Sequence, residues 1–210
     1  MRLAVNLAGV LPGYAGMEES FLRNTLAQFR LLHAVEEIAL ITDPHNHDAF
    51  EGWDRLRVPD AGAVERAAKS LRPDVLLSAV ETAPTGSGVP LVLYALDVQD
   101  AEAEGARRPW FGGSRMSQAK RAAQSAVAMV VPSKFVQQEC LRVLEMPMDK
   151  VVVAPLGTDL SADAAPGCFA QKPFLLAVGD GAELRNVPRL LDAMRRAPLL
   201  EAHILVVVGH

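Results

Sequence analysis

Short, continuous apolar segments alternate with helical patterns along most of the chain. The segments expected to form strands are residues 3–9, 37–42, 74–80, 90–96, 128–133 and 150–157. Apolar residues recur at helical spacing between them, over residues 17–33, 63–71, 114–126 and 133–144. Because the strand segments are apolar throughout rather than alternating, both faces of their sheet should be covered, which indicates a parallel sheet. The pattern therefore predicts an α/β fold, a Rossmann-like doubly wound sheet that binds ligands beyond the carboxyl ends of its strands.

The alternation stops at residues 161–173, a stretch rich in Ala, Pro and Gly that is typical of a linker. It restarts with a strand, a helix and a strand, at residues 174–180, 187–196 and 203–209. We therefore expect a first domain over residues 1–160 and an incomplete start of a second Rossmann-like domain over residues 174–210. A strand–helix–strand piece of this size cannot bury its own faces. Its apolar surface should associate with another chain, which leaves a homo-oligomer open.

Composition and charge exclude several classes of protein. Half of the residues are hydrophobic, 22% are charged and the net charge is −4, as in a soluble globular protein with no general attraction to nucleic acid. No stretch of about 18 apolar residues occurs, so no transmembrane segment is expected. The first apolar run ends at Pro12–Gly13 and fits a strand better than a signal peptide. Cys140 and Cys168 fit no metal spacing, which predicts reduced thiols in a cytoplasmic protein and no metal site.

The sequence GYAGMEESFLRN, residues 13–24, connects the first expected strand to the first expected helix. Gly13 and Gly16 lack a Cβ atom, so backbone N–H groups there can approach a phosphate or sugar closely. The helix that begins near Met17 would point the positive end of its dipole at the same place. A strand-to-helix turn that requires positive φ explains two such glycines equally well. The residues alone leave both interpretations open.

Three other stretches carry polar or basic side chains. HNHD at residues 45–48 has two histidines two positions apart and an aspartate, which could form part of a metal site. No further ligand can be named, so a solvated loop is predicted. ARRPWFGGSR at residues 106–115 could meet a lipid-linked or phosphorylated acceptor, which leaves peripheral membrane contact open, although solvated charges explain it better. ETAPTGSG at residues 81–88 predicts only a loop. Ser133 is predicted to cap the helix that follows it.

The order of five segments resembles the GT-B glycosyltransferases of the large retaining family 4. These segments are GYAGMEESFLRNTL, VPLVLYALDVQD, AVAMVVPSKFVQQECLRVLEMPMDKVVVAPLGTDL, FLLAVGDGAELRNVPRLLDAM and HILVVVGH. Each segment by itself matches the family only weakly. The order of the five segments is specific, and together they cover nearly the whole chain. The resemblance implies two facing Rossmann-like domains, with a nucleotide-sugar donor mostly on the second and an acceptor on the first. The implied reaction transfers the sugar to an acceptor hydroxyl with retention at the anomeric carbon, without a cofactor or a metal.

The resemblance also implies which residues bind the donor. Gly13 and Gly16 would lie against the donor phosphates or sugar. Arg185 stands where the family most often has Lys and would neutralise the pyrophosphate, because a guanidinium can bind phosphate oxygens in a bidentate manner. A solvated arginine at the start of a helix is the alternative.

Acceptor-binding positions implied by the resemblance are Tyr14, Glu18 and Asp97, and Asp97 is also the candidate catalytic residue. Asp97 follows an expected strand and could orient the acceptor hydroxyl, although a loop or N-cap acid is an equal explanation. Leu96 replaces the histidine that the family usually has before this aspartate. Because leucine can neither donate a hydrogen bond nor carry charge, the usual contact with the donor sugar is lost.

A second departure is that the family's pair of glutamates seven residues apart does not occur at the corresponding place within these 210 residues. We therefore expect no turnover by this chain alone. A truncated or degenerate relative that acts as a non-catalytic binding or partner subunit is the first alternative. A nucleotide-sugar epimerase would need acids and histidines at strand ends that are not evident. A general nucleotide-binding Rossmann domain would need a G-x-G-x-x-G loop, which is also missing.

Overall fold

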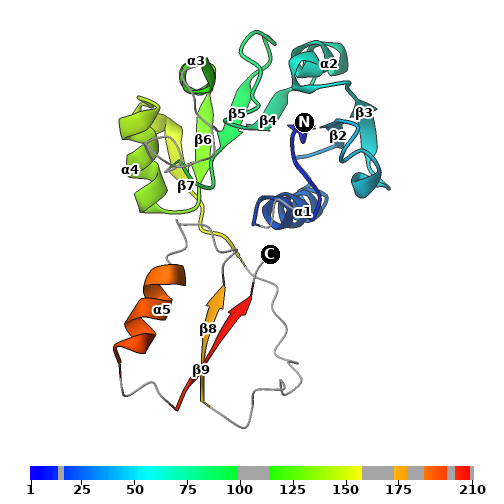
Figure 1. Cartoon of the computed structure of the whole chain (residues 1–210). Coiled ribbons are helices and arrows are strands. Elements are labelled where there is room, and N and C mark those ends of the chain that lie inside the picture. Colours follow the sequence, from blue (N-terminus) through cyan, green and yellow to red (C-terminus); the bar gives the residue numbers. More distant parts are fainter. Residues whose placement is uncertain (14–16, 99–113, 158–172, 179–186, 198–201, 209–210) are drawn as a thin grey trace. The chain divides into compact units, whose positions relative to one another are not determined.

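A computed structural model describes most of the chain. The described residues are 1–13, 17–98, 114–157, 173–178, 187–197 and 202–208. Contacts within the chain divide it into two compact units, Met1–Gly157 and Thr158–His210, each of which contains parallel strands and at least one helix (Figure 1). None of the helices in the described ranges is both long and apolar enough to cross a membrane.

The first unit is built on a seven-stranded parallel sheet with strand order β3-β2-β1-β4-β5-β6-β7. Its strands are β1 (Arg2–Asn6), β2 (Glu37–Thr42), β3 (Asp54–Arg57), β4 (Val75–Ala79), β5 (Leu91–Tyr94), β6 (Ala128–Val131) and β7 (Val151–Val153). Its helices are α1 (Met17–Phe29), α2 (Val64–Leu71), α3 (Ser114–Ser125) and α4 (Lys134–Val143), with 3-10 turns at Asp48–Phe50, Ala61–Ala63 and Met148–Lys150. The winding direction reverses between β1 and β4, and ligands of doubly wound folds bind at the carboxyl ends of such strands.

Two apolar clusters cover the two faces of this sheet. Leu3 and Val5 of β1 belong to the cluster that contains the buried Leu22 and Leu26 of α1, whereas Ala4 belongs to the cluster beneath α2, α3 and α4. Successive residues of a strand point to opposite faces, so this division follows from the strand period. In Figure 1, α1 accordingly lies on the other side of the strands from α2 and α3. The Rossmann-like parallel sheet predicted from continuous apolar strands is confirmed.

The predicted elements agree with the observed ones except at their ends and at β3. The strand expected over residues 90–96 ends at Tyr94, and the helix expected over residues 17–33 ends at Phe29. Strand β3 was not predicted because its sequence, DRLR, has no apolar run; it is an edge strand that pairs with β2 alone. The predicted cap of α4 is confirmed, because Oγ of Ser133 accepts a hydrogen bond from the Val136 N–H at 3.2 Å.

The second unit contains the parallel pair β8 (Phe174–Val178) and β9 (Ile204–Val208) and the helix α5 (Val187–Arg195). No residue of this unit within the described ranges is fully buried, and Val178 is 74% exposed. Two strands and one helix offer too little surface to cover both faces of a sheet. Association of this apolar surface with another chain stays a prediction.

Of the two cysteines, Cys140 lies in the core of the first unit and Cys168 lies outside the described residues. Cys140 is a buried free thiol, and burial raises its pKa to about 12. A thiol with so high a pKa is a poor nucleophile near neutral pH. Cys140 is therefore a core residue rather than a site residue.

Candidate functional site at the carboxyl ends of the strands

The loop that follows β1 is held by two side chains from the segment that follows β2. Nδ2 of Asn46 donates to the carbonyl oxygens of Leu7 at 2.6 Å and Val10 at 2.9 Å. Oδ1 of Asn46 accepts from the backbone N–H of Asp43 at 3.0 Å. The carboxylate of Asp43 in turn accepts from the backbone N–H of Gly9 at 2.7 Å. Since Asn46 and Asp43 are both buried, the loop has a fixed shape rather than a solvated one.

This geometry corrects the prediction that HNHD, residues 45–48, is a solvated loop. The side chain of His45 is 73% exposed, but Asn46 is fully buried. Nδ1 of His47 shares a hydrogen bond with Oγ1 of Thr42 at 2.7 Å. Hydrogen bonds to three backbone groups replace the hydrogen bonds that the Asn46 amide would make with water. This compensation explains why a polar side chain can be buried here. No group of three His, Cys, Asp or Glu side chains that could hold a metal occurs within the described part of the chain.

A second buried polar contact joins the two strands at which the winding reverses. Nδ2 of Asn6, the last residue of β1, donates to Oγ of Ser78 in β4 at 2.9 Å and to the carbonyl of Thr82 at 3.2 Å. Oδ1 of Asn6 accepts from the Ala8 N–H at 3.1 Å. Gly9 has a φ of +94°, and a Cβ atom there would lie 3.2 Å from Cγ2 of Thr82. The loops after β1 and β4 are therefore packed against each other.

Gly13, one of the glycines predicted to approach a donor phosphate, already has a partner for its N–H. Its φ is +74°, and its N–H donates to Oε2 of Glu19 at 2.6 Å. Oε1 of the same carboxylate accepts from Nε of Arg23 at 2.8 Å. Glu19 lies in the first turn of α1, where negative charge complements the helix dipole. A donor phosphate at Gly13 would have to replace this carboxylate, and the phosphate role of Gly13 stays a prediction.

Replacing Glu19 by Gln is expected to lower the free energy of unfolding at neutral pH and to have little effect in acid. Hydrogen bonds from Gly13 and Arg23 hold the pKa of Glu19 below its usual value of 4.5. Stability from such a group is present above the unfolded-state pKa and is lost as the pH falls through the lower folded-state pKa. The difference between the two proteins should therefore shrink below about pH 4.5. Urea unfolding over a pH series measures it, and a difference that does not change with pH would contradict the ionic origin.

Tyr94, the last residue of β5, joins that strand to the first turn of α1. Its side chain is 2% exposed, and its hydroxyl donates to Oε1 of Glu18 at 2.8 Å. Burial raises the pKa of Glu18, and the hydrogen bond from Tyr94 acts in the opposite direction. Burial and the charge of Glu18 raise the pKa of Tyr94, which is therefore a neutral donor at physiological pH. The ring of Phe21, with its centroid 5.3 Å from that of Tyr94, packs beside it.

One of the predicted site residues, Glu18, is held by Tyr94, a residue that the sequence did not point to. Glu18 contacts it directly, and Leu96 and Asp97 follow it by two and three residues in the chain. Leu96 is half-buried and packs against the cluster that contains α1, whereas Asp97 is exposed. Three further predicted site residues, Tyr14, Gly16 and Arg185, lie outside the described residues.

The sequence did not reveal four residues whose side chains make contacts between distant parts of the chain. These residues are Tyr94, Asn6, Asp43 and Asn46. One signal was present for Asn6, because an amide inside the apolar run LAVNLAG has to find partners in a buried place. The segment TDPHN, residues 42–46, combines turn residues with side chains that bond to nearby backbone, which is a weaker signal. Nothing in the sequence distinguished Tyr94 from an ordinary aromatic core residue of a strand.

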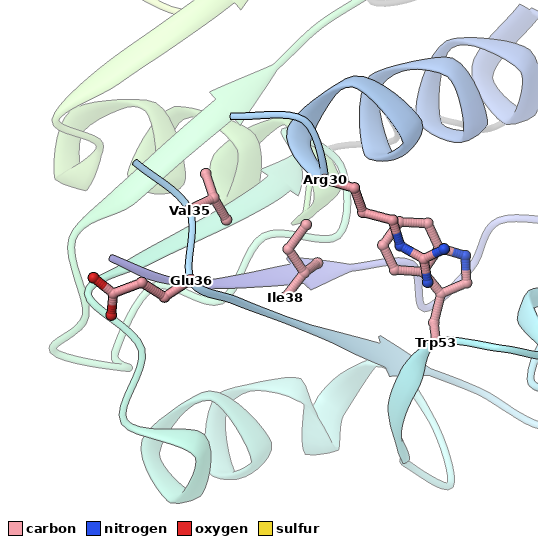
Figure 2. Close-up of a pocket in the computed structure, with 5 residues that line it drawn as sticks. All are labelled: Arg30, Val35, Glu36, Ile38 and Trp53. Carbon is pink, nitrogen blue, oxygen red and sulfur yellow. The ribbon is translucent and has the colours of Figure 1, made fainter. Parts of the chain in front are cut away.

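A separate surface hollow lies at the opposite, amino ends of β2 and β3. It has a volume of about 210 Å³ and is lined by Arg30, Val35, Glu36, Ile38 and Trp53 (Figure 2). Cζ of Arg30 lies 3.5 Å from the centroid of the Trp53 ring, and Nη2 of Arg30 donates to the Gly52 carbonyl at 2.9 Å. Figure 2 shows the guanidinium over the indole face and Glu36 directed away from both. Arg30 therefore occupies one face of the indole ring, and a sugar could not stack on that face.

The solved structures that this chain is similar to include three glycosyltransferases. The lipopolysaccharide outer core galactosyltransferase WaaB in its apo form has 11% identity and a TM-score of 0.62. HepE from Anabaena in complex with UDP and glucose has 14% identity and a TM-score of 0.70, and UGT89C1 from Arabidopsis thaliana complexed with UDP-L-rhamnose has 12% identity and a TM-score of 0.52. Each alignment covers 100% of this chain and, in the same order, 68%, 61% and 69% of the other chain.

No family model matches the sequence, and no curated protein matches it at a significant level. At identities of 11 to 14%, the likeness to solved structures establishes the fold alone. The chain has the Rossmann-like α/β fold of the GT-B glycosyltransferases, as the resemblance of its sequence predicted.

Proposed function

We propose that this protein transfers a sugar from a nucleotide-sugar donor to an acceptor hydroxyl, with retention at the anomeric carbon. The observation that supports the proposal is the likeness of the whole chain to GT-B enzymes, two of which hold UDP with glucose or UDP-L-rhamnose. The fixed loop after β1 lies at the end of the sheet where doubly wound folds bind nucleotides. The donor is a substrate in this proposal, and no cofactor takes part.

The proposed roles divide between the two units. Acceptor binding is assigned to Tyr14, Glu18 and Asp97 in the first unit, and Asp97 orients the reacting hydroxyl. Arg185 in the second unit neutralises the donor diphosphate, because its planar guanidinium matches pairs of phosphate oxygens. Gly13 and Gly16 supply backbone N–H groups, and at Gly13 the donor replaces the carboxylate of Glu19.

The chain spans 61 to 69% of the length of the three glycosyltransferases named above, so the activity of a whole protein belongs to the proposal. We expect no turnover by the 210 residues alone, because the glutamate pair implied by the resemblance is not among them. Reading the coding DNA beyond the His210 codon determines which protein should be assayed. Transfer by the 210-residue chain itself would overturn this part of the proposal.

A second candidate function is that of a non-catalytic relative that binds a carbohydrate or a partner chain. One observation favours it: Leu96 packs against the apolar cluster of α1 and presents no polar group where the resembling family has a histidine. Such a protein would bind a nucleotide sugar or a glycan without releasing nucleoside diphosphate. Release measured together with binding separates the two functions.

Arg185→Ala is expected to raise the donor KM about tenfold or more, since a hydrogen bond to a charged group is worth about 1.5–3 kcal/mol. The assay measures release of nucleoside diphosphate from a panel of nucleotide sugars, with mixed hydroxyl acceptors, by the protein expressed from its complete reading frame. Arg195→Ala is the matched control, because Arg195 is an exposed α5 residue whose Nη1 lies 3.5 Å from Asp192. Binding without release would favour the non-catalytic relative, and absence of both would contradict the proposed function.

A further inference from the structure

We propose that Tyr94 positions Glu18, and that the carboxylate held in this way accepts a hydrogen bond from the sugar acceptor's hydroxyl. This inference rests on the proposed function and adds a positioning residue to it. The contact joins residues 76 positions apart, from the end of β5 and the first turn of α1. Strand β5 is separated from β1 by β4, so the side chains of Tyr94 and Glu18 bridge two strand positions at the carboxyl ends of the sheet.

The geometry leaves one oxygen of Glu18 available to a ligand. The Tyr94 hydroxyl donates to Oε1 at 2.8 Å, and within the described part of the chain no hydrogen bond reaches Oε2. Glu18 as a whole is only partly buried. An ionised carboxylate accepts up to about four hydrogen bonds. A carboxylate fixed at Oε1 and open at Oε2 therefore presents an oriented acceptor for an O–H group.

A purely structural role would not require an acid at this position. A buried tyrosine hydroxyl is satisfied equally well by a neutral oxygen, whereas a partly buried carboxylate has a desolvation cost. Burial accordingly raises the pKa of Glu18. Acids held in unfavourable surroundings at a ligand-binding edge are typical of functional sites.

The charges around the pair decide how it titrates. Tyr94 ends β5 and lies against Glu18 of α1, and Glu81 follows β4. Burial raises the pKa of Tyr94, and the charges of Glu18 and Glu81 raise it further. The hydrogen bond from Tyr94 lowers the pKa of Glu18, and burial raises it. Removing the hydroxyl while keeping the ring should therefore raise the pKa of Glu18 further, because burial remains and the lowering contact is lost.

The first test needs no activity. Carboxyl carbon NMR titration of Glu18 in the wild type and in Tyr94→Phe should show a higher pKa in the variant. An unchanged or lower pKa would overturn the positioning role of Tyr94. Thermal unfolding of the same samples confirms that the variant is folded, and Glu18→Gln provides a second variant that keeps a neutral oxygen for Tyr94.

The second test measures acceptor kinetics in the protein expressed from its complete reading frame. Glu18→Gln and Tyr94→Phe should each raise the acceptor KM about tenfold with the donor KM unchanged, since a charge-assisted hydrogen bond is lost or misdirected. The acid limb of the acceptor KM profile should move to higher pH in Tyr94→Phe, and the double variant should be no worse than Glu18→Gln. Glu37→Gln is the matched control, because Glu37 pairs with Arg2 at 2.6 Å at the amino end of the sheet.

The two tests separate the possible failures. If the pKa of Glu18 responds to Tyr94→Phe but acceptor KM does not change, the acceptor contact is overturned while the pair itself stands. If the wild type transfers no sugar from any donor, the proposed function fails, and the NMR titration still decides whether Tyr94 positions Glu18.

Discussion

Replacing Asn46 by Ala is expected to lower the free energy of unfolding by about 3 kcal/mol or more. The side chain is fully buried and bonds to the carbonyls of Leu7 and Val10 and to the N–H of Asp43. Alanine leaves the Val10 carbonyl and the Asp43 N–H without these partners, and the Leu7 carbonyl keeps only the Val10 N–H at 3.0 Å. Each buried group without a partner costs about 1–3 kcal/mol, less where water can enter, and the cavity left by the side chain adds to the loss. Urea unfolding measures the loss. The same variant should bind ligands poorly, because the loop after β1 loses the contact that fixes its shape.

Two further variants define the cause. Asn24→Ala is the matched control, because Asn24 lies on the exposed side of α1 and alanine has a higher helix propensity, so stability should be unchanged or slightly higher. Asn46→Asp keeps the size of the side chain but cannot donate to the two carbonyls, and it adds a negative charge beside Asp43. It should be at least as unstable as Asn46→Ala at neutral pH. A well-tolerated Asn46→Asp would show that the donated hydrogen bonds are not what holds the loop.

Replacing Gly9 by Ala is expected to cost more stability than replacing Gly13 by Ala. Both glycines have positive φ, +94° and +74°, which costs an L-residue about 1–2 kcal/mol. Only at Gly9 would the new methyl group meet a neighbour, Cγ2 of Thr82 at 3.2 Å; at Gly13 nothing lies within 4 Å. The total cost should be about 2–3 kcal/mol for Gly9→Ala and about 1 kcal/mol less for Gly13→Ala. Denaturant unfolding of the two variants measures this difference.

A double variant separates the two causes at Gly9. Thr82→Ser removes the Cγ2 methyl group and keeps the hydroxyl that Asn6 donates to at 3.2 Å. Combined with Gly9→Ala, it should recover the crowding part of the loss and leave the part that comes from φ. Equal costs for Gly9→Ala and Gly13→Ala would show that the close approach of the loops after β1 and β4 contributes little.

Both predictions concern the same feature, the loop after β1, which contacts with neighbouring loops hold in a fixed shape. Asn46 and Asp43 hold it from the β2 side, and Asn6, at the end of β1, joins it to Ser78 and Thr82 on the β4 side. A loop that is already ordered loses less conformational entropy when a ligand binds. Under the proposed function, the buried polar contacts would therefore serve binding as well as stability.

The sequence by itself determined the architecture. Continuous apolar strands indicated a sheet covered on both faces, and helical spacing placed Leu22 and Leu26 on the buried side of α1. Ser133 was recognisable as a cap because a helix N-terminus needs an acceptor for its free N–H groups. Each of these features depends on neighbours within a few residues, so a local pattern records it. Strand β3 was not predicted, because an edge strand needs no apolar run.

The side chains that form the candidate site could be recognised only in the folded chain. The contacts of Asn46 with Leu7 and of Glu18 with Tyr94 join residues 39 and 76 positions apart. No periodicity connects such pairs, since their meeting depends on the order of the strands and on the register between them. The partner of Gly13 was equally hidden, because a free backbone N–H and one bonded to Glu19 have the same sequence. Polar groups in a buried place take whichever partners the completed fold brings within reach.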